Sequence, residues 1–321
     1  MKALVLHEFG DVGNLALDEV PEPVPQTGHQ LIRVRSAGVN YADWHWIEGT
    51  YLRRPELPVI PGTEVVGFDA AGRRVLAMTM KAGWAEAAVA ANPVVVPLPD
   101  FLSDGEALAL GLQGFTAWQV LRRCGRLTRG DSVAVFGAAG GTGSLAVQLA
   151  RAWGARRIIA VASTADKREL ALSLGAHAAV DSNDDDLAGA LREANGGRPI
   201  DLILETTGGK TRDACLSSLA MFGRLVVFGS VTAAPSTPVA PEGLMHGSRS
   251  IVGFWASDLF HAQPLLLRDT VTGLIGLIKK GQLRPVVGGE YPLADGAKAL
   301  EAITSRGTVG KLVLKVGEPG N

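Results

Sequence analysis

The clearest chemical signal in the sequence is a glycine-rich turn between an apolar run and an amphipathic segment. Residues 133–136 are typical of a buried parallel strand, and from Ser144 the apolar residues recur at helical spacing. At such a turn a pyrophosphate meets open backbone N–H groups and the positive end of a helix dipole. The predicted phosphate-binding residues are Ala138, Gly140, Gly141, Thr142 and Gly143. Ala138 replaces the first glycine of the usual G-x-G-x-x-G pattern, but the flanking strand and helix favour a dinucleotide site over an ordinary turn.

The residues after the next apolar run favour NADPH over NADH. An acidic residue about 20 positions past the glycines would bind the ribose 2′-hydroxyl of NAD. Ser163 stands at that place and leaves room for a 2′-phosphate, while Lys167 and Arg168 follow within one helical turn. Cations stabilise a phosphate that a carboxylate would repel. The alternative interpretation is that Lys167 and Arg168 simply form an exposed helix face.

Composition places these motifs in an ordinary two-domain protein. The chain has 321 residues, a net charge of −1 and 47% hydrophobic residues, which argues against a nucleic-acid partner and against disorder. Cys124 and Cys215 are the only cysteines, so neither a disulfide framework nor a cysteine zinc knuckle is expected. The apolar run at residues 3–6 is too short for a signal peptide or a membrane span. We expect a cytoplasmic protein without a membrane partner.

The order of predicted elements separates a β-rich region from an alternating one. Up to about residue 99 the chain reads as short strands between Gly and Pro, with one helix near residues 40–49. From Ser103 helices and strands alternate, which predicts a doubly wound parallel sheet with right-handed crossovers. The predicted strands of that sheet are residues 133–136, 158–162, 178–180, 201–205, 225–228 and 250–254. The segments from residue 255 onwards, which end in a strand at residues 311–316, are expected to return to the first domain.

Six short segments together resemble the zinc-less quinone oxidoreductases, the zeta-crystallin-like branch of the medium-chain dehydrogenase/reductase superfamily, along nearly the full length. These segments are 37–43 (AGVNYAD), 61–67 (PGTEVVG), 114–118 (GFTAW), 137–143 (GAAGGTG), 284–287 (RPVV) and 307–314 (GTVGKLVL). The resemblance implies an α/β fold with a central Rossmann sheet and a GroES-like β-rich domain built from both chain ends. The expected domains are the N-terminal part of the GroES-like catalytic domain at 1–115, the Rossmann domain at 116–254, and the return at 255–321.

The resemblance also implies that no metal takes part. Zinc-containing members of the superfamily hold a catalytic metal with Cys, His, and Cys or Asp. In this sequence the expected first Cys falls near Asn40 and the expected His is Thr63, so Glu64 remains as a lone carboxylate. The structural-loop cysteines are missing as well. We therefore expect no metal ligands.

The resemblance assigns roles to residues in both domains. Asn40 lines the nicotinamide pocket, and positions matching His45 and Tyr51 carry tyrosines proposed to orient the substrate. His45 departs from that pattern: a histidine there can donate a proton at neutral pH, or it can simply form a hydrogen bond at the domain surface. The Lys167 position binds the 2′-phosphate. The resemblance also matches five further positions to residues that line the cofactor: Thr116, Phe228, Gly229, Phe254 and Lys311. Independently of the resemblance, Thr207 is a predicted cofactor residue because it follows the carboxyl end of another predicted strand. Trp44, Trp46 and Trp255 are candidates for an apolar wall of the cleft, although packing in the small domain is an equal alternative for Trp44.

The resulting functional hypothesis is an NADPH-dependent reductase that transfers hydride to a small-molecule quinone or enone. Two alternatives stay open, an enoyl-thioester reductase and a non-catalytic, crystallin-like NADPH-binding protein. The sequence does not name the acceptor or distinguish one-electron from two-electron reduction. The last predicted strand, at residues 250–254, presents apolar residues at an uncovered sheet edge, which predicts a homodimer formed by strand pairing.

Overall fold

The computed structural model describes residues 1–51, 54–79, 81–232 and 234–317, and these residues divide into two compact units. Unit 1 comprises Met1–Phe115, Ser257–Leu274 and Pro285–Asn321, and unit 2 comprises Thr116–Ala256 and Ile275–Arg284. The first boundary coincides with the one expected at 115/116. Residues 275–284 fall in unit 2, although the sequence placed them in the return to the first domain, whose last four residues, 318–321, lie outside the described part.

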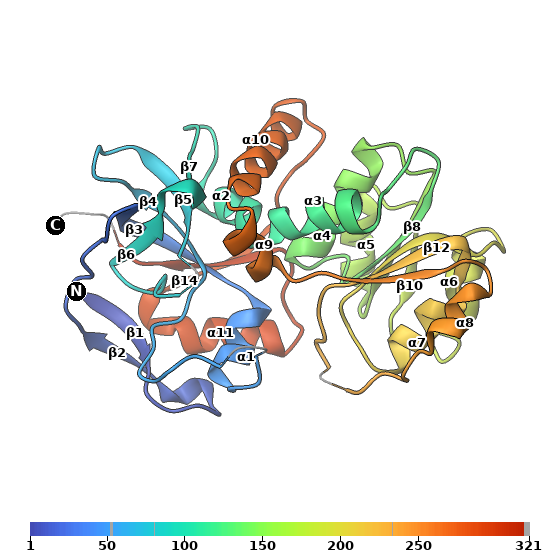
Figure 1. Cartoon of the computed structure of the whole chain (residues 1–321), viewed down its shortest axis with the longest axis horizontal. Coiled ribbons are helices and arrows are strands. Elements are labelled where there is room, and N and C mark those ends of the chain that lie inside the picture. The colour runs from blue at the N-terminus through green and yellow to red at the C-terminus, as the bar shows by residue number, and fades with distance from the viewer. Residues whose placement is uncertain (52–53, 80, 233, 318–321) are drawn as a thin grey trace. The chain divides into compact units, whose positions relative to one another are not determined.

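Unit 2 contains the expected parallel sheet, with strand order β10-β9-β8-β11-β12-β13. Its strands β8, β10 and β12 are labelled in Figure 1. This order reverses between β8 and β11, which is where the Rossmann fold opens its ligand crevice. The strands are β8 (Ser132–Phe136), β9 (Arg157–Ala162), β10 (Ala178–Asp181), β11 (Ile200–Glu205), β12 (Leu219–Val227) and β13 (Ser250–Gly253). The helices of this region are α3 (Phe115–Gln119), α4 (Gly141–Ala152), α5 (Ala165–Ser173), α6 (Leu187–Ala194), α7 (Lys210–Ser217) and α8 (Pro241–Met245).

Two details of unit 2 differ from the sequence-based prediction. Strand β12 begins at Leu219, six residues before the predicted start at residue 225, because α7 stops at Ser217 and its Ser218 cap leads straight into the sheet. The segment Ile275–Arg284 joins unit 2 through a reciprocal pair of bonds. Gln148 Nε2 donates to the Arg284 carbonyl at 3.0 Å, and Arg284 N donates to Gln148 Oε1 at 2.7 Å.

Unit 1 is built from both chain ends around a seven-stranded sheet in which β15 and β3 are antiparallel neighbours. Its strands are β1 (Lys2–Leu6), β2 (Leu15–Glu19), β3 (His29–Val39), β4 (Glu64–Phe68), β5 (Arg74–Met78), β6 (Ala87–Ala91), β7 (Val95–Pro97), β14 (Val287–Pro292) and β15 (Lys311–Lys315). Strands β1 and β2 form a separate pair. The helices of unit 1 are α1 (Tyr41–Ile47), α2 (Asp104–Ala109), α9 (Ala256–Ala262), α10 (Leu265–Lys279) and α11 (Gly296–Thr304). The first residue of α9 and the last residues of α10 belong to unit 2. Pairing of β3 with β15 confirms the expected return of the C-terminal end.

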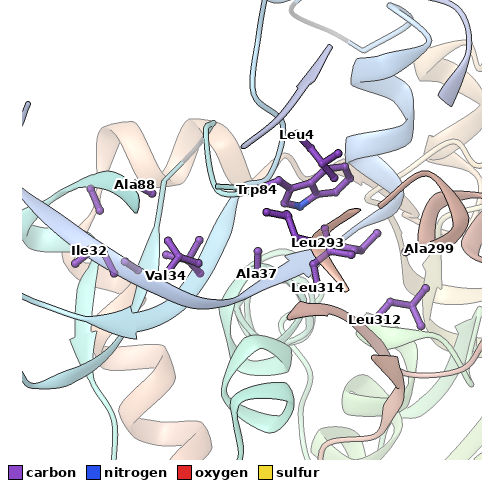
Figure 2. Close-up of a cluster of buried hydrophobic side chains, with 14 of the residues drawn as sticks. Leu4, Ile32, Val34, Ala37, Trp84, Ala88, Leu293, Ala299, Leu312 and Leu314 are labelled. Atoms are coloured by element: carbon purple, nitrogen blue, oxygen red, sulfur yellow. The ribbon is translucent and has the colours of Figure 1, made fainter. Parts of the chain in front are cut away.

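The core of unit 1 joins the two chain ends around one tryptophan. Trp84 is fully buried, and its Nε1 donates to the Gly38 carbonyl at 3.0 Å. Figure 2 shows Leu293 and Leu314, from the C-terminal part of the chain, beside the Trp84 indole. Leu4 from the N-terminal strand lies on the same ring. This packing holds β3 and β15 together, and those two strands lead into the polar residues described next.

None of the helices in the described part of the chain combines the length and the hydrophobicity needed to cross a bilayer.

Candidate active site

The glycine turn of unit 2 has the geometry of a phosphate cradle. Gly137, directly after β8, adopts φ +60°, and Gly140 caps α4 without a side chain of its own. A Cβ on Gly143 would lie 2.1 Å from the Gly137 carbonyl oxygen, so this position accepts only glycine. Ala138 is fully buried, and its N–H donates to the Val161 carbonyl at 3.2 Å. The first amides of α4 are thereby presented at the carboxyl end of the sheet, where a helix terminus attracts an anion.

The other predicted cofactor residues of unit 2 follow the carboxyl ends of neighbouring strands. Ser163 follows β9, and Thr207 comes two residues after β11. Phe228 and Gly229 follow β12, and Phe254 follows β13. Because these strands are parallel, their carboxyl ends lie along one edge of the sheet, beside the glycine turn after β8. Thr116 lies apart from this row, on α3, and is 8% exposed.

A buried carboxylate that sequence reasoning missed fixes the turn after β11. Glu205 has no exposed surface, and its side chain accepts the backbone N–H groups of Thr207 and Gly208. Arg212 Nε donates to Glu205 at 2.9 Å, and Arg212 Nη2 donates to the Gly229 carbonyl at 3.1 Å. A Cβ on Gly229 would lie 2.3 Å from Thr206 Oγ1. The ion pair of Arg212 and Glu205 therefore connects the end of β11 to the residues that follow β12.

After β9, the side chains of Lys167 and Arg168, the two cations noted in the sequence, lie in different surroundings. Thr164 caps α5 and accepts the Lys167 N–H at 3.4 Å, which places Lys167 in the first turn, one residue past Asp166. Arg168 instead donates to Asp181 at 2.8 Å and to the Ala162 carbonyl at 3.1 Å. The Arg168 guanidinium thus binds the end of β10. Lys167 remains the predicted partner of a 2′-phosphate.

In unit 1 a buried polar network surrounds Asn40, the residue before α1. Its Nδ2 donates to Glu64 Oε1 at 3.0 Å and to Thr63 Oγ1 at 3.3 Å, and its Oδ1 accepts from Lys311 Nζ at 3.0 Å. Lys311 also forms an ion pair with Glu64, and neither side chain is exposed. Both amide hydrogens of Asn40 are therefore used inside the domain, and the side chain is 4% exposed. This makes Asn40 a structural centre of the network.

A second carboxyl group lies beside this network. Asp43 Oδ2 accepts the Asn40 N–H at 2.7 Å and closes a capping box at the start of α1. Burial raises the pKa of Asp43 from 3.8 to about 7, and the nearby charge of Glu64 acts in the same direction. The bond from Asn40 N and the charge of Lys311 oppose that increase.

The predicted substrate residues His45 and Tyr51 are brought together by the end of α1. Both Thr50 N and Tyr51 N donate to the His45 carbonyl, at 2.9 and 3.1 Å. His45 Nδ1 lies 2.9 Å from Thr50 Oγ1, and burial lowers the pKa of His45. Trp44 and Trp46 pack against the core of unit 1, which for Trp44 is the packing alternative raised from the sequence.

Comparison with known proteins shows the family of the chain. The family model described as alcohol dehydrogenase GroES-like domain matches residues 26–100, and the model described as zinc-binding dehydrogenase matches residues 141–272. The quinone oxidoreductase of Rattus norvegicus is 33% identical over 98% of this chain and 97% of its own length. The chain belongs to the quinone oxidoreductase family of the medium-chain dehydrogenase/reductase superfamily. The family expected from the six sequence segments is confirmed.

Two solved structures of similar proteins cover almost the whole chain. The quinone oxidoreductase of Thermus thermophilus, whose structures include a complex with NADPH, has a TM-score of 0.87 and 36% identity over 98% of this chain and all of its own. A mycobacterial protein solved in complex with NADPH has a TM-score of 0.90 and 32% identity over the same shares. The Rossmann and GroES-like architecture predicted from the sequence is thereby confirmed.

One matching family model carries zinc in its description, but the side chains around Glu64 do not fit a zinc site. The positions where a zinc-containing member of the superfamily is expected to carry its first Cys and its His hold an amide and a hydroxyl, Asn40 and Thr63. The Glu64 carboxylate is occupied by the Lys311 ammonium, Asn40 Nδ2 and the Leu112 N–H, the last at 2.5 Å. Within the described ranges no three His, Cys, Asp or Glu side chains are grouped as metal ligands. A lysine ammonium provides the positive charge beside Glu64.

Proposed function

We propose that this protein is an NADPH-dependent oxidoreductase that transfers hydride to a quinone or an activated alkene without a metal. The observation that carries the proposal is the row of Ser163, Thr207, Gly229 and Phe254, which follow the carboxyl ends of β9, β11, β12 and β13 on either side of the glycine cradle after β8. Its support from outside the chain is the similarity to quinone oxidoreductases, one of them solved with NADPH.

The residues of unit 2 would bind and orient the cofactor. The amides at the start of α4, around Gly141 and Thr142, receive the pyrophosphate, because the helix dipole and open N–H groups favour an anion. Ser163 leaves space for the 2′-phosphate and Lys167 supplies its counter-charge. When bound, NADPH supplies the hydride and its two electrons. The protein's task is to hold the reacting atoms close and to stabilise the negative charge that develops on oxygen.

The residues of unit 1 divide into a scaffold and a donor pair. Lys311, predicted from the resemblance to line the cofactor, has no exposed surface and holds Glu64 and Asn40 in place. His45 and Tyr51 are the candidates for donating hydrogen bonds to the acceptor oxygen, since the amide of Asn40 is already used. Hydride transfer to one carbonyl oxygen of a quinone would leave the negative charge on the opposite oxygen, and the resulting hydroquinone monoanion would take its proton from solvent.

A panel of acceptors tests the substrate class. The purified protein should oxidise NADPH with quinones or simple enones far faster than with enoyl thioesters. Faster turnover of an enoyl thioester would replace the proposal with the thioester reductase, and saturable NADPH binding without turnover would replace it with the binding protein. Product analysis for semiquinone radicals distinguishes one-electron from two-electron reduction. The same activity should survive a chelator, and elemental analysis should find no stoichiometric zinc.

The proposal includes a homodimer joined at β13. Strand β13 is the outermost strand of its sheet, pairs only with β12 in the described part of the chain, and carries the half-buried Ile251 and Val252. An open strand edge of this kind invites pairing with a second copy. Light scattering should give the mass of a dimer, and Val252→Lys should shift it to a monomer. A wild-type monomer at micromolar concentration would refute the dimer.

A further inference from the structure

His45 lies in the last turn of α1, and its ring is held on three sides. The ring centroid is 4.8 Å from that of Trp44 and 5.4 Å from that of Tyr41. The third contact is polar, with Nδ1 at 2.9 Å from Thr50 Oγ1. The imidazole therefore packs between two aromatic rings, and a threonine hydroxyl lies within hydrogen-bond distance of its Nδ1.

The hydrogen bonds accepted by the His45 carbonyl indicate whether Thr50 Oγ1 or His45 Nδ1 is the donor in the bond between these two side chains. After α1 the chain turns at Gly49, whose φ of +70° brings the next residues back. The His45 carbonyl then accepts the N–H groups of Thr50 and Tyr51, at 2.9 and 3.1 Å. A carbonyl oxygen has two lone pairs, so this acceptor is saturated. The Thr50 hydroxyl lies 3.5 Å from it, at the limit of a hydrogen bond, whereas Nδ1 is 0.6 Å closer, at 2.9 Å.

We infer that Thr50 is a positioning residue whose hydroxyl donates to His45 Nδ1 and thereby keeps the imidazole proton on Nε2. This inference rests on the proposed function and deepens it, because it makes Nε2–H the hydrogen-bond donor for the carbonyl oxygen of the quinone or enone. In the opposite tautomer Nε2 carries a lone pair, which repels the oxygen on which negative charge develops.

It matters which nitrogen of His45 carries the proton because the ring is neutral. Burial lowers the pKa of His45, so the side chain is uncharged near pH 7, and a neutral imidazole has one donor and one acceptor nitrogen. A tyrosine, which the family resemblance places at this position, always presents an O–H group. A histidine in the same place needs a partner that selects its tautomer, and Thr50 has the required geometry.

The chemistry requires only a hydrogen bond from His45. Hydride addition to the quinone carries two electrons from NADPH, which becomes NADP⁺, and yields the hydroquinone monoanion. Nε2–H stabilises that oxyanion without losing its proton, and a solvent proton completes the hydroquinone. His45 is therefore unchanged at the end of the cycle.

The test compares Thr50→Val, which keeps the shape and removes the hydroxyl, with Thr50→Ser, which keeps the hydroxyl. Thr50 is exposed, so both variants should fold, and thermal melts check this. Nitrogen-15 NMR, assigned by difference from His45→Gln, should show His45 protonated on Nε2 in the wild type and in Thr50→Ser. In Thr50→Val the tautomers should mix, and kcat/KM for quinone should fall about 10-fold, the loss of one transition-state hydrogen bond. NADPH affinity should stay unchanged.

Three results would overturn the inference. They are a wild-type ring protonated on Nδ1, a Thr50→Val ring with unaltered tautomer, and unaltered kcat/KM for every acceptor despite a changed tautomer. The NMR readout does not depend on turnover. A wild type with the Nε2–H tautomer and no activity toward any acceptor therefore contradicts the proposed function itself, and with it this role of Thr50.

Discussion

Lys311 and Glu64 form an ion pair although neither side chain has any exposed surface. They come from β15 and β4, 247 residues apart in the sequence. The pair is extended by Asn40, which accepts from Lys311 and donates to Glu64 at 3.0 Å each. The Lys311 ammonium thus lies beside Glu64 and Asn40. The pair connects β15 to β4 through side chains that have no exposed surface.

The first prediction concerns the strength of this pair. Lys311→Met leaves a buried carboxylate without its partner and should lower the free energy of unfolding by roughly 3–5 kcal/mol. The matched control is Lys315→Met on the same strand, whose pairing with Glu290 is 3.9 Å long and about half exposed, so its loss should stay below roughly 1 kcal/mol. Urea unfolding measures both. Equal losses in the two variants would show that the buried pair has no special weight.

The second prediction is a pH dependence caused by Asp43. Its pKa is raised from 3.8 to about 7 in the folded protein, so between these values the folded state binds more protons than the unfolded state. Stability contributed by this group is therefore present at low pH and is lost as pH rises toward 7, by at most roughly 1.4 kcal/mol per pH unit.

The variant Asp43→Asn isolates that effect, because an amide can still accept the Asn40 N–H but does not titrate in this range. Urea unfolding between about pH 4 and pH 8 should show the wild type losing stability relative to the variant up to about pH 7, and no further relative change above it. Parallel pH profiles for the two proteins, or a wild-type gain with pH, would contradict the assignment.

The third prediction concerns the glycine turn. An alanine at position 143 would place its Cβ 2.1 Å from the Gly137 carbonyl oxygen, so the turn must shift, at a cost of about 1–3 kcal/mol in stability. NADPH binding should weaken with it, because the α4 amides move. Gly140→Ala is the matched comparison, since that Cβ would be 3.2 Å from the same oxygen at an ordinary φ of −75°. Calorimetric titration that finds both variants binding NADPH like the wild type would remove the turn from the cofactor site.

The fourth prediction concerns cofactor preference. Lys167→Ala should weaken NADPH binding by roughly 1–3 kcal/mol, the scale of a charge-assisted hydrogen bond, and leave NADH binding nearly unchanged. The neighbouring variant Arg168→Ala should retain the wild-type ratio of the two affinities, because that guanidinium binds Asp181. Fluorescence titration with both cofactors measures the ratios. A wild-type preference for NADH, or equal losses for both cofactors in Lys167→Ala, would contradict the assignment.

Much of unit 2 could be predicted from the sequence because its signals are local. The apolar run before Gly137, the glycine turn and the helical spacing from Ser144 are adjacent, and each is dictated by steric rules. Strand β14 (Val287–Pro292) had no such signal. Its Gly288 and Gly289 disfavour a strand by propensity, and Gly288 is required only because a Cβ there would lie 1.7 Å from the Val309 carbonyl oxygen.

The polar networks could not be predicted because their partners are distant in sequence. Glu64 looked like a lone carboxylate, and nothing near it indicates Lys311. Arg168 looked like a second phosphate ligand until β10 placed Asp181 beside it. The interaction of His45 with Thr50 spans five residues, but it depends on the left-handed turn at Gly49. Local sequence patterns predict helices and strands, whereas these side-chain pairings can be seen only in the folded chain.

The measurement that tests the account most directly is NADPH oxidation by the chelator-treated protein, followed by absorbance, with a quinone as the acceptor. The account predicts catalytic turnover that is unchanged by removal of metal ions and much slower with NADH in place of NADPH. Saturable NADPH binding without turnover, or activity that is lost on chelation and restored by zinc, would contradict it.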